Sequence, residues 1–211
     1  MTAVFHWVLI EPLIDQAIAF EAHASAAAVL REPVVDRPTQ RIGLVLGMVL
    51  YGAVWGLFFG AAFRMLEPRF PANWSRARQG AVLAPLFGWS VGVFPFLKYP
   101  ANPPGVGDPE TIIYRQVLYF GFIILAVLGI AMAGALGRSL HRAFPVQQSL
   151  GSVGVYGIFA IALYFAMPAN PDPVALPFEL VSRFRAIALA GLVFFWTLFG
   201  AAFGWLARER P

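Results

Sequence analysis

Long runs without a charged residue dominate the chain, and the charged residues gather between them. Five of these runs reach the length of about 18 apolar residues needed to cross the hydrocarbon core of a bilayer. They are residues 42–63, 80–97, 116–137, 150–167 and 186–206. Because backbone groups in lipid must satisfy their own hydrogen bonds, and the runs lack strand-like alternation, each run predicts a helix. The pattern therefore predicts an all-α integral membrane protein, a bundle of about five transmembrane helices.

The segment before these runs is expected to behave differently, so that residues 1–41 form an outer segment and residues 42–211 the bundle. Residues 1–10 are apolar, but they are too few to span a membrane before Glu11 interrupts them. From Leu13 to Leu30 an Ala-rich pattern predicts a helix that carries charges and lies at the membrane surface. Within the bundle, Pro85 and Pro95 are expected to kink or shorten the second spanning helix.

Composition supports lipid as the solvent and excludes several kinds of function. Mean hydropathy is +0.71 and only 12% of the residues are charged, about half the usual share. The absence of cysteine excludes disulfides and thiolate metal sites. The sequence has no phosphate-binding loop, no zinc-protease motif and no nucleophile elbow, so we expect no enzymatic activity. No basic stripe interleaves with aromatic residues, so nucleic acid is not an expected partner.

The distribution of charge between the loops predicts an orientation. Segments 64–79, 138–149 and 207–211 would share one side of the membrane, and they carry eight of the 15 Lys and Arg residues. They carry only two of the 11 Asp and Glu residues. Basic residues favour the cytoplasmic side, so we expect 64–79 to be cytoplasmic and 98–115 and 168–185 to face outside.

A short repeat marks the acidic side. The tetrapeptide Pro-Ala-Asn-Pro occurs at 100–103 and at 168–171, each time after a predicted span. An acid and then an arginine follow each copy, which predicts repeated hairpins of helix, outer loop and helix. In the second copy these loop residues are Asn170, Pro171, Glu179, Arg183 and Arg185. Segment 31–41 resembles a third copy whose leading helix is missing, so a six-helix design truncated at its start is expected. A chance match between Pro-rich loops is the alternative.

The loop from Phe96 to Arg115 is the best candidate for chemistry. Its prolines restrict the backbone, so ordering its polar groups costs less entropy. Asn102, Asp108 and Glu110 offer oxygen ligands suited to a divalent cation. The other residues of this loop motif are Lys98, Tyr99, Pro100, Pro103, Pro104 and Arg115. In the alternative interpretation, Asp108 is simply the N-cap of the next helix.

A second candidate metal cluster lies in the first segment. Glu11 and Asp15 are four residues apart, which places them on one face of a helix, and Glu21 and His23 follow. Mixed imidazole and carboxylate ligands suit cobalt, nickel or zinc. Because the cluster lacks a tight ligand spacing, a solvated helix face is the alternative.

The five predicted spans contain no Asp, Glu, Lys, Arg or His. Buried ionisable groups usually mark the ion path of a transporter, so this chain alone is expected to conduct ions poorly. Glycines at four-residue spacing, such as Gly43 and Gly47, favour close packing of helices within the bundle or against a partner.

Four segments carry a resemblance to a known family. Residues 95–104, followed by 106–109, closely resemble the signature of the predicted cobalt transporter subunit CbtA family. Three more segments match in order: Glu11-Pro12 with Asp15 and residues 17–21, Gln40-Arg41 leading into 49–52, and residues 183–185. The family departs from this sequence at the start, because its members begin with an additional hydrophobic span before the Glu-Pro motif.

The resemblance implies a multi-pass subunit of the bacterial inner membrane that takes up Co²⁺ for cobalamin synthesis. It also implies a small single-span, His-rich partner, CbtB-like, which would supply the imidazoles that this chain lacks. The competing interpretation is a structural or assembly protein that binds a partner through its Pro-rich outer loops. The uncharged spans favour this second interpretation, and the acid-bearing outer loops favour transport.

Overall fold

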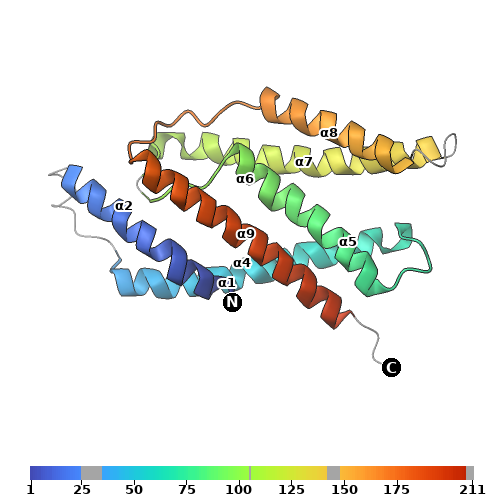
Figure 1. Cartoon of the computed structure of the whole chain (residues 1–211), viewed down its shortest axis with the longest axis horizontal. Helices are drawn as coiled ribbons and strands as arrows, with labels where there is room; N and C mark the ends of the chain where they lie inside the picture. The colour runs from blue at the N-terminus through green and yellow to red at the C-terminus, as the bar shows by residue number, and fades with distance from the viewer. Residues whose placement is uncertain (25–34, 105, 142–147, 208–211) are drawn as a thin grey trace. The chain divides into compact units, whose positions relative to one another are not determined.

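The computed structural model describes residues 1–24, 35–104, 106–141 and 148–207, and its regular elements in these ranges are all helical (Figure 1). In chain order they are α1 (Thr2–Phe5), η1 (His6–Ile10), α2 (Glu11–Ala24), α4 (Arg37–Leu66), η2 (Glu67–Arg69), α5 (Arg76–Gly88), η3 (Trp89–Val93), α6 (Phe94–Lys98), η4 (Pro109–Thr111), α7 (Ile112–His141), α8 (Gln148–Ala166) and α9 (Phe178–Leu206). The all-α prediction is confirmed.

Within the described residues, five helices are long and apolar enough to cross a membrane, judged by length and composition. They are Thr2–His23, Arg37–Arg69, Arg76–Lys98, Pro109–Gly137 and Phe178–Leu206. The predicted number is confirmed, and four of the helices coincide with predicted spans. The fifth is the N-terminal helix, whereas Gly151–Ala166 is a shorter apolar helix.

The N-terminal helix corrects two expectations. A helix was expected from Leu13, but helical structure begins at Thr2 and continues through Glu11 to Ala24. A helix therefore precedes segment 31–41, and the expectation that its leading helix is missing is wrong. Residues 25–34 lie outside the described residues, and the repeated hairpins remain a prediction.

π-helical turns explain how two helices continue through prolines. A proline cannot donate to the carbonyl four residues before it, and its ring crowds that carbonyl. For Pro12 and Pro95 these carbonyls belong to Val8 and Val91, which lie inside the π turns η1 and η3. Pro85 and Pro95 were expected to kink or shorten the second span. It is not shortened, because helical structure runs from Arg76 to Lys98, and the kink stays a prediction.

The chain divides into two compact units. Unit 1 comprises residues 1–86, 101–106 and 174–211, and unit 2 comprises residues 87–100 and 107–173.

In unit 2, α7 and α8 lie side by side along their length (Figure 1). Glycine permits this close approach, because a Cβ at Gly129 would lie 2.1 Å from the Phe159 ring. The core of the unit contains Phe94, Phe122 and Leu163, all buried.

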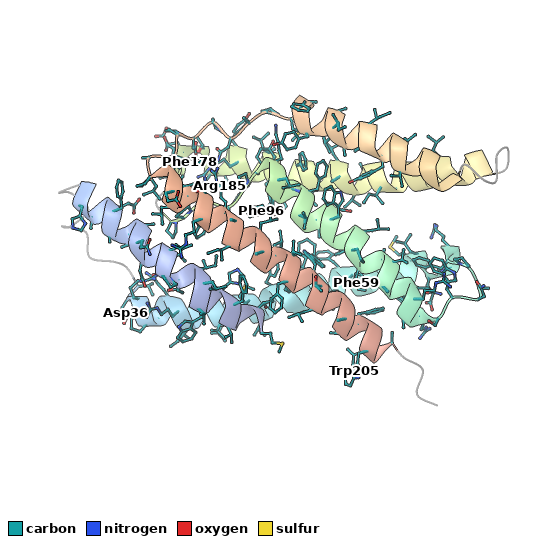
Figure 2. All side chains as sticks on the ribbon, viewed as in Figure 1. Asp36, Phe59, Phe96, Phe178, Arg185 and Trp205 are labelled. Carbon is teal, nitrogen blue, oxygen red and sulfur yellow. The ribbon has the colours of Figure 1, made fainter. Side chains whose placement is uncertain are left out.

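In unit 1, the N-terminal helix packs against α9. Ile10 and Leu13 form a buried cluster with Phe184, one of the residues near the start of α9. Further along α9, the Phe203 ring lies 4.9 Å from the ring of Phe59 in α4. Phe59, which Figure 2 labels, is almost fully buried. The contacts with Phe184 bury Ile10 and Leu13, side chains that a lone amphipathic surface helix would leave exposed.

Candidate functional site

Hydrogen bonds within unit 2 join the residues just before the first Pro-Ala-Asn-Pro copy to the chain at the start of the second copy. Lys98, the last residue of α6, donates from Nζ to the carbonyl oxygen of Tyr164 at 2.7 Å. Its neighbour Tyr99 donates from Oη to the carbonyl oxygen of Pro168, also at 2.7 Å. The last carbonyls of a helix have no partner within the helix, so Lys98 satisfies one of them at the end of α8. The Lys98-Tyr99 part of the loop motif therefore fastens the end of α6 to the end of α8.

Asp172 is the central residue of the second loop, and the sequence reasoning missed it. Its side chain is 2% exposed, and Arg115 Nε lies 3.0 Å from its Oδ2. Thr111 Oγ1 donates to Oδ1 at 2.8 Å, and the Asp108 backbone N–H donates to Oδ2 at 3.1 Å. A buried carboxylate is tolerated when it is paired and hydrogen bonded. Asp172 thus attaches the second Pro-rich loop to the start of η4 and α7.

Gly107 makes room for this carboxylate. Its φ of 112° lies in the left-handed region, which residues with a Cβ rarely adopt. A Cβ at this position would lie 2.5 Å from Arg115 Nη1 and 2.8 Å from Asp172 Oδ2. The glycine after Val106 in the loop motif is therefore required by both conformation and space.

Asp108 is the N-cap of the helix that begins at Pro109, as the alternative interpretation predicted. Its Oδ1 accepts from the Glu110 backbone N–H at 2.9 Å. Its own carbonyl oxygen accepts from Arg115 Nη2 at 3.1 Å. Asp108 and Glu110 are both exposed, so the loop presents two carboxylates to its surroundings. Their role as metal ligands stays a prediction.

Asn102, the third predicted oxygen ligand, already binds a cationic side chain in unit 1. Its Oδ1 accepts from Arg185 Nη2 at 2.6 Å and from Arg185 Nε at 3.2 Å. Arg185 lies near the start of α9, and Figure 2 labels it there. The adjacent Pro103 is fully buried, whereas Pro104 is exposed and Pro100 half-buried. A metal ion would have to compete with the guanidinium group for this amide oxygen.

Glu11 and Asp15 do share a helix face, as predicted, but both face arginines of α4 in unit 1. Arg37 Nη2 lies 2.8 Å from Glu11 Oε2, and Arg41 Nη2 lies 3.0 Å from Asp15 Oδ2. Glu11 is buried, so this pairing stabilises its charge. The sequence contained the signal, because Arg37 and Arg41 have the same four-residue spacing as the two acids.

The other members of the predicted cluster do not complete a ligand set. His23 is exposed, and its Nδ1 lies 2.5 Å from the carbonyl oxygen of Ala19. Glu21 is half-buried. Among the described residues, no group of three or more His, Asp or Glu side chains is placed to hold a metal ion. The structure thus does not bring these four residues together as one ligand set, and their individual metal roles stay predictions.

The second Pro-Ala-Asn-Pro copy is not equivalent to the first. Asn170 Oδ1 accepts from the Asp172 backbone N–H at 3.1 Å, which is a local turn and not a contact with α9. The other predicted members of this repeat loop, Pro171, Glu179 and Arg183, are exposed. The signal for Asp172 was its position between Pro171 and Pro173, two residues after an asparagine.

A family profile matches almost the whole chain. The profile of "Probable cobalt transporter subunit (CbtA)" matches residues 1–208. No curated protein and no solved structure matches significantly. The family is one of transporter subunits, and the apolar helices described above fit a multi-pass membrane protein. With the family profile matching residues 1–208, this chain belongs to the CbtA family of probable cobalt transporter subunits.

Proposed function

We propose that this chain is the multi-pass inner-membrane subunit through which bacterial cells take up Co²⁺. The observation that carries the proposal is the family match over residues 1–208. A transporter subunit moves its substrate without changing it, which agrees with the lack of a catalytic motif in the sequence. The cation is substrate here and not a resident cofactor.

Asp108 and Glu110 receive the cation on the outer side. Both carboxylates are exposed on a loop whose backbone is fixed by the bonds from Asp108 and Thr111 to Asp172. A fixed loop loses little conformational freedom when it binds a ligand, so more of the interaction energy remains for affinity. Carboxylate oxygens replace part of the water shell of a divalent ion before the ion moves on.

A second subunit supplies the ligands that this chain does not assemble. The described residues contain no cluster of three metal-binding side chains, and the five predicted spans are uncharged. A divalent ion without ligands in a medium of low dielectric constant is strongly disfavoured. We infer that a small single-span, His-bearing protein, CbtB-like, provides imidazoles along the path. The family description as a subunit supports a complex with another chain.

Accumulation of radioactive cobalt in cells that express the chain with its partner tests the proposal. The Asp108→Asn, Glu110→Gln double variant removes both charges, while Asn keeps the N-cap. We expect it to lower accumulation about three- to tenfold at equal membrane abundance, mainly through a higher KM, because fewer charged oxygens attract the ion. Unchanged uptake would show that the loop only connects two helices.

Asp36→Asn is the matched control. Asp36 is also an exposed N-cap, with Oδ1 accepting from the Thr39 backbone N–H at 3.2 Å. Hydrogen bonds from the Thr39 side chain and then from its backbone lower the pKa of the Asp36 carboxyl, so the control also removes a full negative charge at neutral pH. Uptake should stay at the unsubstituted level in this control if the effect at Asp108 is local.

The competing function, a non-transport assembly protein, is favoured by the same lack of a metal-binding cluster among the described residues. It predicts that cells lacking this chain but expressing the partner accumulate cobalt normally. Transport predicts that accumulation falls to background and returns when the chain is restored.

A further inference from the structure

The loop between α4 and α5 is the most basic described segment of unit 1. Residues 64–79 contain four arginines and one acid, Glu67. We call Arg64, Arg69, Arg76 and Arg78 the arginine loop, and all four side chains are exposed. Glu67 Oε1 lies 3.0 Å from Arg76 Nε, so the single acid neutralises one of the four. A net positive charge remains on this surface.

Two aromatic rings hold the loop in shape. The rings of Phe70 and Trp74 stack with centroids 6.0 Å apart and planes inclined by 27°. Arg78 Cζ lies 4.3 Å above the Trp74 ring, which is a cation–π geometry. Arg69 Nη1 donates to the carbonyl oxygen of Met65 near the end of α4. These contacts hold the Arg78 guanidinium group over the half-buried Trp74 ring and that of Arg69 at the end of α4.

Connectivity places this loop at a membrane surface. The helices on both sides of it, Arg37–Arg69 and Arg76–Lys98, are each long and apolar enough to cross a bilayer. The few residues that join them cannot carry the loop far from the lipid. Trp residues concentrate at the level of lipid head groups, as Trp74 would. The four guanidinium groups are then within reach of the phosphates, on whichever side the loop faces.

We propose that the arginine loop binds the head groups of anionic phospholipids. A guanidinium group donates two parallel hydrogen bonds to phosphate oxygens, and it holds its charge at all relevant pH values. Juxtamembrane basic clusters are attracted to anionic lipid surfaces. The zwitterionic head group of phosphatidylcholine offers the same phosphate without net charge, so the loop should discriminate between the two lipids. The proposal is independent of cobalt transport.

Electron paramagnetic resonance of spin-labelled lipids in proteoliposomes tests it. The full chain is reconstituted in phosphatidylcholine with a trace of spin-labelled phosphatidylglycerol or spin-labelled phosphatidylcholine, and the immobilised fractions are compared. We expect phosphatidylglycerol to associate about two- to fivefold more strongly. The Arg64→Gln, Arg69→Gln, Arg78→Gln variant should bring that ratio to about one. These side chains are exposed, so the variant should fold, which its circular dichroism checks.

Two controls make the result specific. Arg183→Gln removes an exposed arginine near the start of α9 and should leave the lipid ratio unchanged. The corresponding Arg→Lys triple variant should keep most of the preference, because the charge remains. The proposal is overturned if the Gln triple variant keeps the full preference. It is equally overturned if inorganic phosphate at constant ionic strength abolishes the preference of the unsubstituted chain, since the site would then bind free anions.

Discussion

Arg115 and Asp172 form an ion pair in which Arg115 Nε lies 3.0 Å from Asp172 Oδ2 and the carboxylate is 2% exposed. The two residues come from different parts of unit 2, one from the first turns of α7 and the other from the loop after α8. Asp172 also accepts from Thr111 and from the Asp108 backbone. Removal of the carboxylate would therefore deprive Arg115 Nε of its ion pair and the Asp108 N–H of its acceptor at once.

The first prediction concerns the stability of this ion pair. Asp172→Ala should lower the free energy of unfolding by about 2–3 kcal/mol, because it removes the ion pair of a partly buried guanidinium and leaves the Asp108 N–H without its acceptor. Arg115 is 27% exposed, so water offsets part of the loss. Equilibrium unfolding of the purified chain in detergent micelles measures the change.

A double-mutant cycle with Arg115→Ala measures the interaction energy between Asp172 and Arg115 apart from their contacts with other residues. The double variant should be less destabilised than the sum of the single variants, since it leaves no unpaired charge. Simple additivity of the two single effects would show that the residues do not interact in the folded protein.

The second prediction concerns Gly107. Gly107→Ala should destabilise the protein by about 1–3 kcal/mol, because its φ of 112° is strained for alanine and the added Cβ would crowd Asp172. Gly56→Ala is the control, since Gly56 lies in α4 with no atom within 4 Å of an added Cβ. It should be neutral or slightly stabilising. Thermal unfolding measures the stability of both variants. If both lose the same stability, the backbone conformation at position 107 does not require glycine.

Most of the spanning helices were predictable because the physics that forms them acts locally. α4, α7 and α9 follow from runs of apolar residues that no internal proline or charge interrupts. The N-terminal helix was misjudged because Glu11 and Pro12 are ordinary signals for an interruption. In the structure, a π turn accommodates the proline and Arg37 and Arg41 pair with the acid. Neither compensation is visible from local sequence.

The candidate site was predictable only in outline. The repeated tetrapeptide and the loop motif identified the two Pro-rich loops and the N-cap role of Asp108. The pairing of Asp172 with Arg115, and of Asn102 with Arg185, depends on contacts between segments far apart in the chain. The sequence marks Asp172 only by its position between two prolines, and that position does not identify Arg115 as its partner, so Asp172 was missed.

The third prediction concerns the depth of the N-terminal helix. Glu11 and Asp15 pair with Arg37 and Arg41, which directly precede the uncharged run 42–63. The charged part of α2 should therefore lie at the outer surface, beside the start of α4, and not at the middle of the bilayer. Gln16 is exposed, so a single cysteine there should react with a membrane-impermeant thiol reagent added to intact cells.

Two other single cysteines calibrate the labelling experiment in this cysteine-free chain. A cysteine at exposed Ala169 should also react from outside, and one at exposed Ala72 should react only after the cells are opened. If the cysteine at position 16 reacts from neither side while that at 169 reacts, the N-terminal helix spans the membrane instead. Reversed labelling at 72 and 169 would invert the predicted orientation.

The last prediction compares the two asparagines of the repeated tetrapeptide, which occupy the same motif position but have different partners. Asn102 accepts two bonds from the cationic Arg185, whereas Asn170 accepts one from a backbone N–H. Hydrogen bonds to charged groups contribute about 1.5–3 kcal/mol and neutral ones about 0.5–1.5 kcal/mol. Asn102→Ala should therefore destabilise the protein more than Asn170→Ala in thermal unfolding.

The Asn102→Asp variant tests whether the side-chain oxygen or the NH₂ group of Asn102 stabilises the loop. Its carboxylate can accept the same two bonds from Arg185 and adds a charge attraction, so stability should return to at least the original value. If Asn102→Asp is as unstable as Asn102→Ala, the amide NH₂ and not the oxygen holds the loop. Cobalt accumulation at equal membrane abundance then tells whether fixing this loop matters to uptake. Because Asn102→Asp restores the contact, it should restore any accumulation that Asn102→Ala loses.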